Sequence, residues 1–327
     1  MKAKKQLRVK AFSLILLLMF FAESRATIYS ISNTINGAQC VPPVVTNGTG
    51  TITGTYNDVT NAMSITITFS GLTGFTTVAH FHGPALPTAN AGVVIGYSGF
   101  PTGVKSGNYS NNYVLTAAQE TQFLGNLWYA NIHTTTNAGG EIRGQVYPQA
   151  ISSLNLTALV EGFYNDGTNL MVADVVTANV RQSTSPYALV ATNSVNLNTG
   201  GNGSANYSGV TNGVNYYLQI LHRNSIETWS MPASFTANAL TYDFTTAATQ
   251  AFGDNMKLKG TEYCNYNGDV NQDDIIDGSD ASQVDNAAAE FLSGYVVEDC
   301  DGNDFVDGSD GAIVDNNASN FVTAAIP

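Results

Sequence analysis

The chain has 327 residues, and its composition excludes several classes of protein. Only 12 Lys and Arg stand against 25 Asp and Glu, which excludes a nucleic-acid-binding protein with a basic surface. The hydrophobic fraction of 43% excludes a disordered polyanion, and the length allows two or three domains with their own cores. The many Thr, Asn, Gly and Ser residues favour short strands joined by turns.

The first 26 residues have the pattern of a secretory signal peptide. Basic residues crowd positions 2–10, an apolar run follows at 11–22, and Ser24 and Ala26 fit a cleavage site. The apolar run is shorter than the roughly 20 residues that cross a membrane, although an N-terminal anchor is the alternative. The sequence therefore predicts a secreted, extracellular protein of a bacterium, with no membrane segment after cleavage.

The acidic residues are concentrated at the C-terminal end. Cleavage would remove six of the 12 basic residues and one of the 25 acids, which leaves 6 − 24 = −18. Fourteen of the remaining acids lie within residues 264–327, where there is no Lys or Arg. This concentration predicts that the segment binds a cation.

Two stretches of this segment, 269–280 and 299–310, repeat at an offset of 30 residues. Oxygen-bearing side chains occupy positions 1, 3, 5, 9 and 12 of each, and an apolar residue at position 7 offers its carbonyl. Ca²⁺ takes six to eight oxygens at about 2.3–2.6 Å, and a tight loop of this spacing supplies most of them. The sequence predicts two calcium sites, with the ligands Asp269, Asn271, Asp273, Ile275, Asp277 and Asp280 in the first, and Asp299, Asp301, Asn303, Phe305, Asp307 and Asp310 in the second.

Position 6 of such loops is usually Gly, because the backbone there has φ > 0, but here it is Asp274 and Asp304. Asp tolerates this left-handed conformation better than most residues. Ile276 and Val306 at position 8 are expected to point into a small core. Helices are predicted at about 280–292 and 310–322.

A loop followed by a helix, twice and without entering helices, resembles the dockerin type I module over nearly all of residues 264–327. The resemblance implies a cohesin-like protein or a cell-surface component as partner, often in a carbohydrate-active assembly. The alternative is a module that calcium only stabilises. Cys264 and Cys300 flank the loops and are the natural pair for one disulfide, which would leave Cys40 free.

Residues 27–149 are strand-like throughout. Apolar residues alternate with polar ones over 63–69, as in a half-buried strand. One helix is predicted at 115–124, with Thr116 and Gln119 as a capping box. Gly139 and Gly140 predict a hairpin turn between strands at 128–133 and 142–147.

Three of the four histidines lie in this region. A strand through His80 and His82 puts both imidazoles on one face, and His133 completes a three-nitrogen site for zinc or copper if its strand is adjacent. The alternative is that the three rings are hydrogen-bonded packing residues. Glu141 and Arg143 alternate on one strand face and are expected to form an ion pair.

The segments 79–85, 128–134 and 139–145, which read AHFHGPA, WYANIHT and GGEIRGQ, together resemble the CHRD domain over about residues 45–148. The resemblance implies a β-sandwich of the kind suggested for copper–zinc superoxide dismutases and implies no firm activity. Dismutase ligation needs more histidines than these three, so a simple mononuclear site is the option that stays open.

Residues 150–262 alternate again, as in an antiparallel Ig-like β-sandwich. Asn202-Gly203 and Asn212-Gly213 are predicted turns. The segment 222–229 is the one chemically rich cluster, and its expected role is structural, with Arg223 paired to Glu227 and Trp229 packed.

The predicted fold is mainly β, with a signal peptide (1–26), a CHRD-like β-sandwich (27–149), an Ig-like β-sandwich (150–262) and a small α-helical, dockerin-like module with two calcium loops (263–327). The predicted function is that of a secreted, non-enzymatic modular protein whose calcium module serves docking or stabilisation, and no catalytic residue is predicted. One alternative is an extracellular metal-binding protein or metalloenzyme that uses His80, His82 and His133. Another is a carbohydrate-associated protein.

Overall fold

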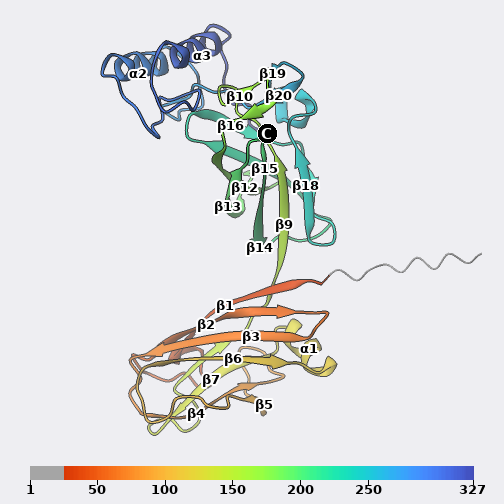
Figure 1. Ribbon diagram of the computed structural model, residues 1–327. Helices are drawn as coiled ribbons and strands as arrows, with labels where there is room; N and C mark the ends of the chain where they lie inside the picture. Colours follow the sequence, from red (N-terminus) through yellow and green to blue (C-terminus); the bar gives the residue numbers. More distant parts are fainter. Residues whose placement is uncertain (1–25) are drawn as a thin grey trace, which may run out of the picture.

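The computed structural model describes residues 26–327, which form three bodies in a row (Figure 1). The predicted signal peptide lies outside the described residues, apart from its last position. An N-terminal domain is followed by a middle domain and then by a C-terminal module that carries two of the three α-helices. Strands dominate the rest, which confirms the predicted fold class.

The N-terminal domain is an eight-stranded antiparallel sheet in the order β5-β4-β7-β8-β1-β2-β3-β6. Strands β8 and β1 meet at a single pair, Asn36 with Arg143, and the curled sheet encloses one core. The strands are β1 (Ile28–Asn36), β2 (Thr49–Asn57), β3 (Ala62–Ser70), β4 (Thr76–His82), β5 (Val93–Gly96), β6 (Gly107–Val114), β7 (Tyr129–Thr134) and β8 (Ile142–Gln145).

Local sequence patterns account for these elements. The alternating apolar residues of β3 are all buried, while their neighbours face solvent or are half-buried. Helix α1 (Ala117–Leu124) begins after Thr116, which forms the predicted capping box with Gln119. The predicted turn at Gly139 and Gly140 joins β7 to β8, which pair antiparallel.

Strand β9 (Gln149–Thr157) crosses from the N-terminal domain into the middle domain. Its first residues pair with β1, where Ala150 lies opposite Tyr29, and the rest of the strand pairs with β14 and β18. The expected domain boundary at 149/150 thus falls within a continuous strand. Because strands of both domains bond to its backbone, β9 joins the two domains directly.

The middle domain packs two sheets around one core. One sheet contains β9, β14 and β18, and the other has the order β13-β12-β15-β16, with β17 beside β15. β18 runs parallel to β9, so the sandwich is not wholly antiparallel. The strands are β10 (Tyr164–Asn165), β11 (Leu170–Met171), β12 (Asp174–Gln182), β13 (Leu189–Leu197), β14 (Asn202–Ser208), β15 (Asn215–His222), β16 (Ser225–Trp229), β17 (Ala233–Ser234), β18 (Ala239–Asp243), β19 (Lys257–Lys259) and β20 (Glu262–Cys264). The domain also contains two 3-10 helices, η2 (Ala248–Gln250) and η3 (Phe252–Asp254). A further 3-10 helix, η1 (Gly37–Gln39), follows β1 in the N-terminal domain.

One of the two turns predicted for this domain is correct. Asn212-Gly213 forms a turn, with φ of 75° at Gly213. Asn202-Gly203 was predicted as a turn but begins strand β14. The chain turns just before it, because the Asn198 side chain accepts hydrogen bonds from the amides of Gly200 and Asn202.

The C-terminal module contains α2 (Gly278–Ala289) and α3 (Gly308–Ser319), each directly after an acidic loop. The helices begin two residues earlier than predicted, because Asp277 and Asp307 cap them. Each loop bonds to the segment that follows the other loop's helix: Ile276 N donates to Val322 O and Val306 N to Leu292 O, both at 3.0 Å. The two repeats thus form one interlocked unit, whose core contains Ile276 and Val306 as predicted.

The predicted disulfide is wrong. Cys264 and Cys300 are both free and buried, and they lie in different cores. Cys264 packs inside the middle domain, whereas Cys300 packs inside the C-terminal module. Burial raises the pKa of the Cys264 thiol to about 12, as expected of an inert core thiol.

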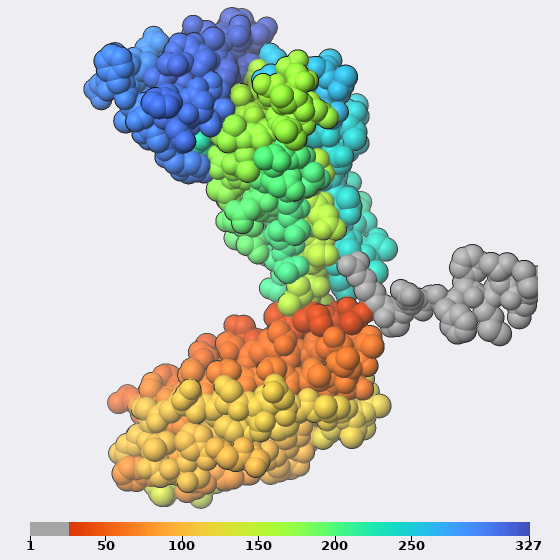
Figure 2. Space-filling view, in the orientation of Figure 1, coloured from red at the N-terminus to blue at the C-terminus, as the bar shows by residue number. Residues whose placement is uncertain are grey.

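The C-terminal module is packed tightly on the middle domain (Figure 2). Ile226 of β16 belongs to the core of the module. Asn317 Nδ2 donates to Glu161 Oε2 at 2.6 Å. A Cβ added to Gly162 would lie 1.9 Å from the carbonyl oxygen of Cys300, so the backbones touch there. The two bodies therefore share core residues, a side-chain hydrogen bond and a close backbone contact.

Within residues 26–327, none of the helices has the length and apolarity that crossing a membrane would require.

Candidate functional site

The two acidic loops have the same backbone fold. The carboxylate of Asp269 accepts the amides of Asp273 and Asp274 at 3.1 and 3.0 Å, and Asp299 does the same for the second loop. At position 6, Asp274 has φ of 69° and Asp304 has φ of 68°, which is the left-handed conformation that the spacing predicts. The carboxylate at position 1 of each loop thus holds the backbone in a closed curve, and the other predicted calcium ligands lie along this curve.

Four carboxylates of these loops are almost fully buried, namely Asp269, Asp280, Asp299 and Asp310, each at most 1% exposed. Oxygens of Asp299, Asp301 and Asp310 lie within 4.8 Å of one another. Burial raises the pKa of Asp269 to about 6 and also raises that of Asp310. Buried like charges are costly unless a cation offsets them, and an all-oxygen donor set of this kind fits Ca²⁺.

One protein cation reaches the acidic loops in the part of the chain that the structure describes. Arg223, in the turn between β15 and β16, lies 3.5 Å from Asp299 Oδ2 and 3.2 Å from Asp174 Oδ2. The predicted pair of Arg223 with Glu227 is therefore wrong. Glu227 accepts from Trp229 Nε1 at 2.9 Å instead, because strand β16 carries it away from the turn, while Trp229 is packed as predicted.

The three predicted histidines lie together on the outer face of strands β4 and β7. His80 Nδ1 is 3.3 Å from His133 Nε2, and one nitrogen of each of the three rings lies within 4.8 Å of the others. Phe81 points the opposite way and is fully buried against Trp128. Antiparallel pairing of β4 with β7 is what brings His133 beside the other two.

Backbone carbonyls fix the tautomers of two of these rings. Nδ1 of His82 donates to Ala91 O at 3.0 Å, and Nδ1 of His133 donates to Ala138 O at 2.9 Å. The lone pair of each ring is therefore on Nε2, and His82 Nε2 is buried with no hydrogen-bond partner among the described residues. Burial lowers the pKa of His80 and of His82, which favours the neutral rings that metals bind.

The predicted ion pair of Glu141 with Arg143 is also wrong. Arg143 lies over the ring of Tyr129, 3.6 Å from its centroid, and Tyr129 stacks on His82 at 5.0 Å. Glu141 precedes strand β8, and its carboxylate is held by donors from other segments: the hydroxyls of Thr46, Thr73 and Thr134 and the amides of Thr73 and Gly74. These donors satisfy Glu141 without a cation.

Residues 31–146 match the family model of the CHRD domain. The match begins before the expected start at about residue 45 and so includes most of β1, which lies beside β2 and β8 in the sheet. It includes the three histidines, Glu141 and Arg143, and it ends before the middle domain.

Solved structures with detectable similarity include two interface mutants of a type II cohesin–X-dockerin complex from Acetivibrio cellulolyticus. Each alignment covers 52% of this chain and 99% of the other, at 13% and 15% identity and TM-scores of 0.34 and 0.29. Similarity at this level carries no conclusion about function. No curated protein matches the chain.

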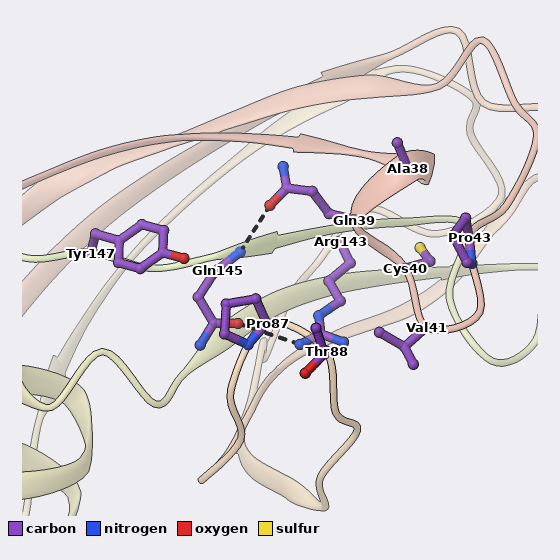
Figure 3. A pocket seen from close by; sticks show the side chains of 10 residues that line it. All are labelled: Ala38, Gln39, Cys40, Val41, Pro43, Pro87, Thr88, Arg143, Gln145 and Tyr147. Atoms are coloured by element: carbon purple, nitrogen blue, oxygen red, sulfur yellow. Dashed lines mark hydrogen bonds between the residues drawn. The ribbon is translucent and has the colours of Figure 1, made fainter.

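A pocket in the CHRD domain was not predicted from the sequence. It has a volume of about 410 Å³, and Arg143 forms part of its lining (Figure 3). Its walls come from η1, the segment after β4 and the end of β8, which are far apart in the chain. The guanidinium of Arg143, which does not pair with Glu141 as predicted, belongs to the lining of this pocket.

The acid stability of the CHRD domain should depend on Glu141. Burial by itself raises the pKa of this carboxyl, but the hydrogen bonds lower it from the ordinary 4.5 to about 2. A depressed folded-state pKa stabilises above pH 4.5, and this contribution of about 3 kcal/mol is lost as the pH falls through 2. We expect Glu141→Gln to destabilise the domain at pH 7 and to flatten this dependence.

The measurement is urea unfolding from pH 7 to 2 in a Trp229→Phe background, where Trp128 is the single fluorescent reporter. Glu290→Gln, at an exposed carboxylate, serves as the control and should keep the wild-type slope. Equal slopes in the Glu141→Gln and control proteins would contradict the assignment.

Proposed function

We propose that the protein is a secreted, non-enzymatic modular protein whose C-terminal module binds two calcium ions and docks onto a protein partner. The observation that carries this proposal is the burial of Asp269, Asp280, Asp299 and Asp310 in two loops of identical design. Among the described residues, Arg223 alone offers these acids a cation, at the second loop. Two divalent ions would offset the remaining charge.

The ligands that we assign are the predicted ones, with side-chain oxygens at positions 1, 3, 5, 9 and 12 and the carbonyls of Ile275 and Phe305 at position 7. Asp277 and Asp307 cap their helices through Oδ1, which leaves Oδ2 of each for an ion. Bound Ca²⁺ would neutralise the buried carboxylates and so stabilise the interlocked loops. The dockerin-like spacing supports the same assignment.

Docking is favoured over stabilisation alone by exposed aromatic residues at equivalent positions of the two repeats. Phe291 and Phe321 follow α2 and α3 and are 88% and 87% exposed. Phe305 and Ile275, at position 7 of the loops, are also exposed. Apolar groups in such number on a small module mark interaction surfaces. The dockerin resemblance makes a cohesin-like domain the partner to test.

Calcium binding is tested by two isosteric variants of the mature chain, residues 27–327, each of which neutralises one carboxylate. Asp299→Asn replaces a buried charged ligand by a neutral amide, and Asp285→Asn makes the same change at an exposed helical position. We expect calorimetry to give two Ca²⁺ ions for the wild type and for Asp285→Asn. In Asp299→Asn the second site should weaken by roughly tenfold or more.

Chelation should also lower the unfolding temperature of the wild type, since an ion that binds only the folded state stabilises it. A wild-type protein that binds no calcium at millimolar concentration, or an unfolding temperature that the chelator leaves unchanged, would contradict the proposed role of the loops.

Docking is tested by replacing both Phe291 and Phe321 with Ser. We expect calcium-dependent binding to cohesin domains from the same organism in the wild type, and a loss of at least tenfold in affinity in the double variant, because the aromatic anchors are removed. Calcium binding should be unchanged and serves as the control. If the wild type binds calcium but no cohesin domain, the docking part of the proposal fails and stabilisation is left.

A second candidate function, binding of a transition metal by the CHRD domain, is favoured by His82 Nε2, which is buried and has no hydrogen-bond partner within residues 26–327. Zn–N bonds of 2.0–2.1 Å in tetrahedral geometry place two ligand nitrogens about 3.3 Å apart. His80 Nδ1 and His133 Nε2 have this separation. Three imidazoles suit zinc or copper and leave a fourth position open, which is the arrangement that a metalloenzyme would use.

For this candidate we expect the calcium-saturated mature chain to bind one Zn²⁺ or Cu²⁺ ion and His82→Ala to bind it at least tenfold more weakly. His222→Gln removes the remaining histidine, which pairs with Asp174 in the middle domain, and should leave the affinity unchanged. Calorimetry with each metal, and electron paramagnetic resonance for copper, give the readout. Equal affinity in wild type and His82→Ala would leave the histidines as packing residues.

A further inference from the structure

The pocket of the CHRD domain opens between η1 and the segment that follows β4 (Figure 3). Its volume of about 410 Å³ is that of a site for a small molecule. The polar lining consists of Gln39, Thr88, Arg143, Gln145 and Tyr147, and proline and valine side chains supply apolar wall. The guanidinium of Arg143 lies between Pro87, Thr88 and Gln145 in this view.

Arg143 is a buried cation with neutral partners only. It is 2% exposed, and its three hydrogen bonds are long, at 3.3 Å to Asn90 Oδ1, 3.4 Å to Leu86 O and 3.3 Å to Gln145 Oε1. No carboxylate lies within 4.0 Å of it among residues 26–327. Buried charges in proteins are normally paired, so this guanidinium lacks an anion.

The acids of the domain do not supply that anion. Residues 27–149 contain three carboxylates, Asp58, Glu120 and Glu141, against the two bases Lys105 and Arg143. Glu141 is the one nearest in sequence, and its carboxylate is already occupied by five hydrogen bonds. The ring of Tyr129 offers Arg143 a cation–π contact, which is weaker than an ion pair.

We propose that this pocket binds a small organic carboxylate, which Arg143 holds at the floor while the proline and valine walls cover its hydrocarbon part. A guanidinium presents paired N–H donors that match the two oxygens of a carboxylate. Arg143 is a single buried cation with no Lys or second Arg beside it among the described residues. It therefore balances the one negative charge of a carboxylate better than the larger negative charge of a phosphate. The proposal rests neither on the calcium loops nor on the histidines.

The charge distribution of the whole chain permits an anion here. The CHRD domain has a net charge near zero, whereas the fourteen acids of residues 264–327 lie in the module at the far end of the molecule (Figure 1). Screening at physiological ionic strength acts over about 8 Å, so the acidic module does not repel a ligand from this pocket.

The test uses benzoate as the charged probe and benzamide as a neutral probe of the same shape, with the calcium-saturated mature chain in saturation-transfer NMR and calorimetry. We expect benzoate to bind at millimolar or lower concentration and benzamide to bind at least tenfold more weakly. Arg143→Gln should weaken benzoate by at least tenfold. Lys105→Gln removes the other base of the domain and should leave the affinity unchanged.

A second variant keeps the test decisive if Arg143→Gln does not fold. Ala38 is exposed at the edge of the pocket, and Ala38→Trp places a large ring there while Arg143 stays intact. We expect this variant to fold and to lose benzoate binding. Absence of benzoate binding to the wild type, equal binding of the two probes, or unchanged binding in Ala38→Trp would each overturn the proposal.

Discussion

Backbone pairing along strand β9 is the interaction on which the arrangement of the molecule depends. The strand bonds to β1 at one end and to β14 and β18 over most of its length, so that the sheets of two domains are joined through it. The tight contact of Gly162 with Cys300 then fixes the C-terminal module to the middle domain. Three segments with separate cores are therefore joined in one elongated chain of domains, with the CHRD domain at one end and the acidic module at the other (Figure 1).

Unbalanced buried charge marks both ends of this chain of domains, with opposite sign. At the C-terminal end, four carboxylates are buried, and among residues 26–327 Arg223 is the one base that reaches them, at Asp299. At the CHRD end, Arg143 is buried beside neutral acceptors. Desolvation makes either arrangement costly unless an ion of opposite charge is present. The same physical reasoning thus supports both proposals, a divalent cation at one end and an organic anion at the other.

The histidine cluster differs from these two sites, because it is characterised by burial and hydrogen bonds and not by an unpaired charge. Backbone carbonyls hold Nδ1 of His82 and of His133, and burial lowers the pKa of His82. Tyr129 lies between this cluster and the pocket, since its ring contacts both His82 and Arg143. The outer face of β4 and β7 and the pocket are therefore neighbouring features, linked by the contact of Tyr129 with Arg143.

The sequence by itself determined the features that depend on residues close to one another in the chain. Alternation in β3, the capping box at Thr116, the spacing of the acidic loops and the left-handed Asp274 and Asp304 all follow from local geometry. The sequence also placed His80 and His82 on one strand face, and pairing of β4 with β7 then added His133.

Only the tertiary structure decided which distant groups satisfy one another. Glu141 is bound by Thr46, 95 positions away, and Arg223 reaches Asp299, 76 positions away, so the pairs expected from sequence proximity did not form. Cys264 and Cys300 are likewise separated because they pack in different cores. Hydrogen bonds and ion pairs depend on distance in space, and that distance is set by how the sheets pack, which no local pattern encodes.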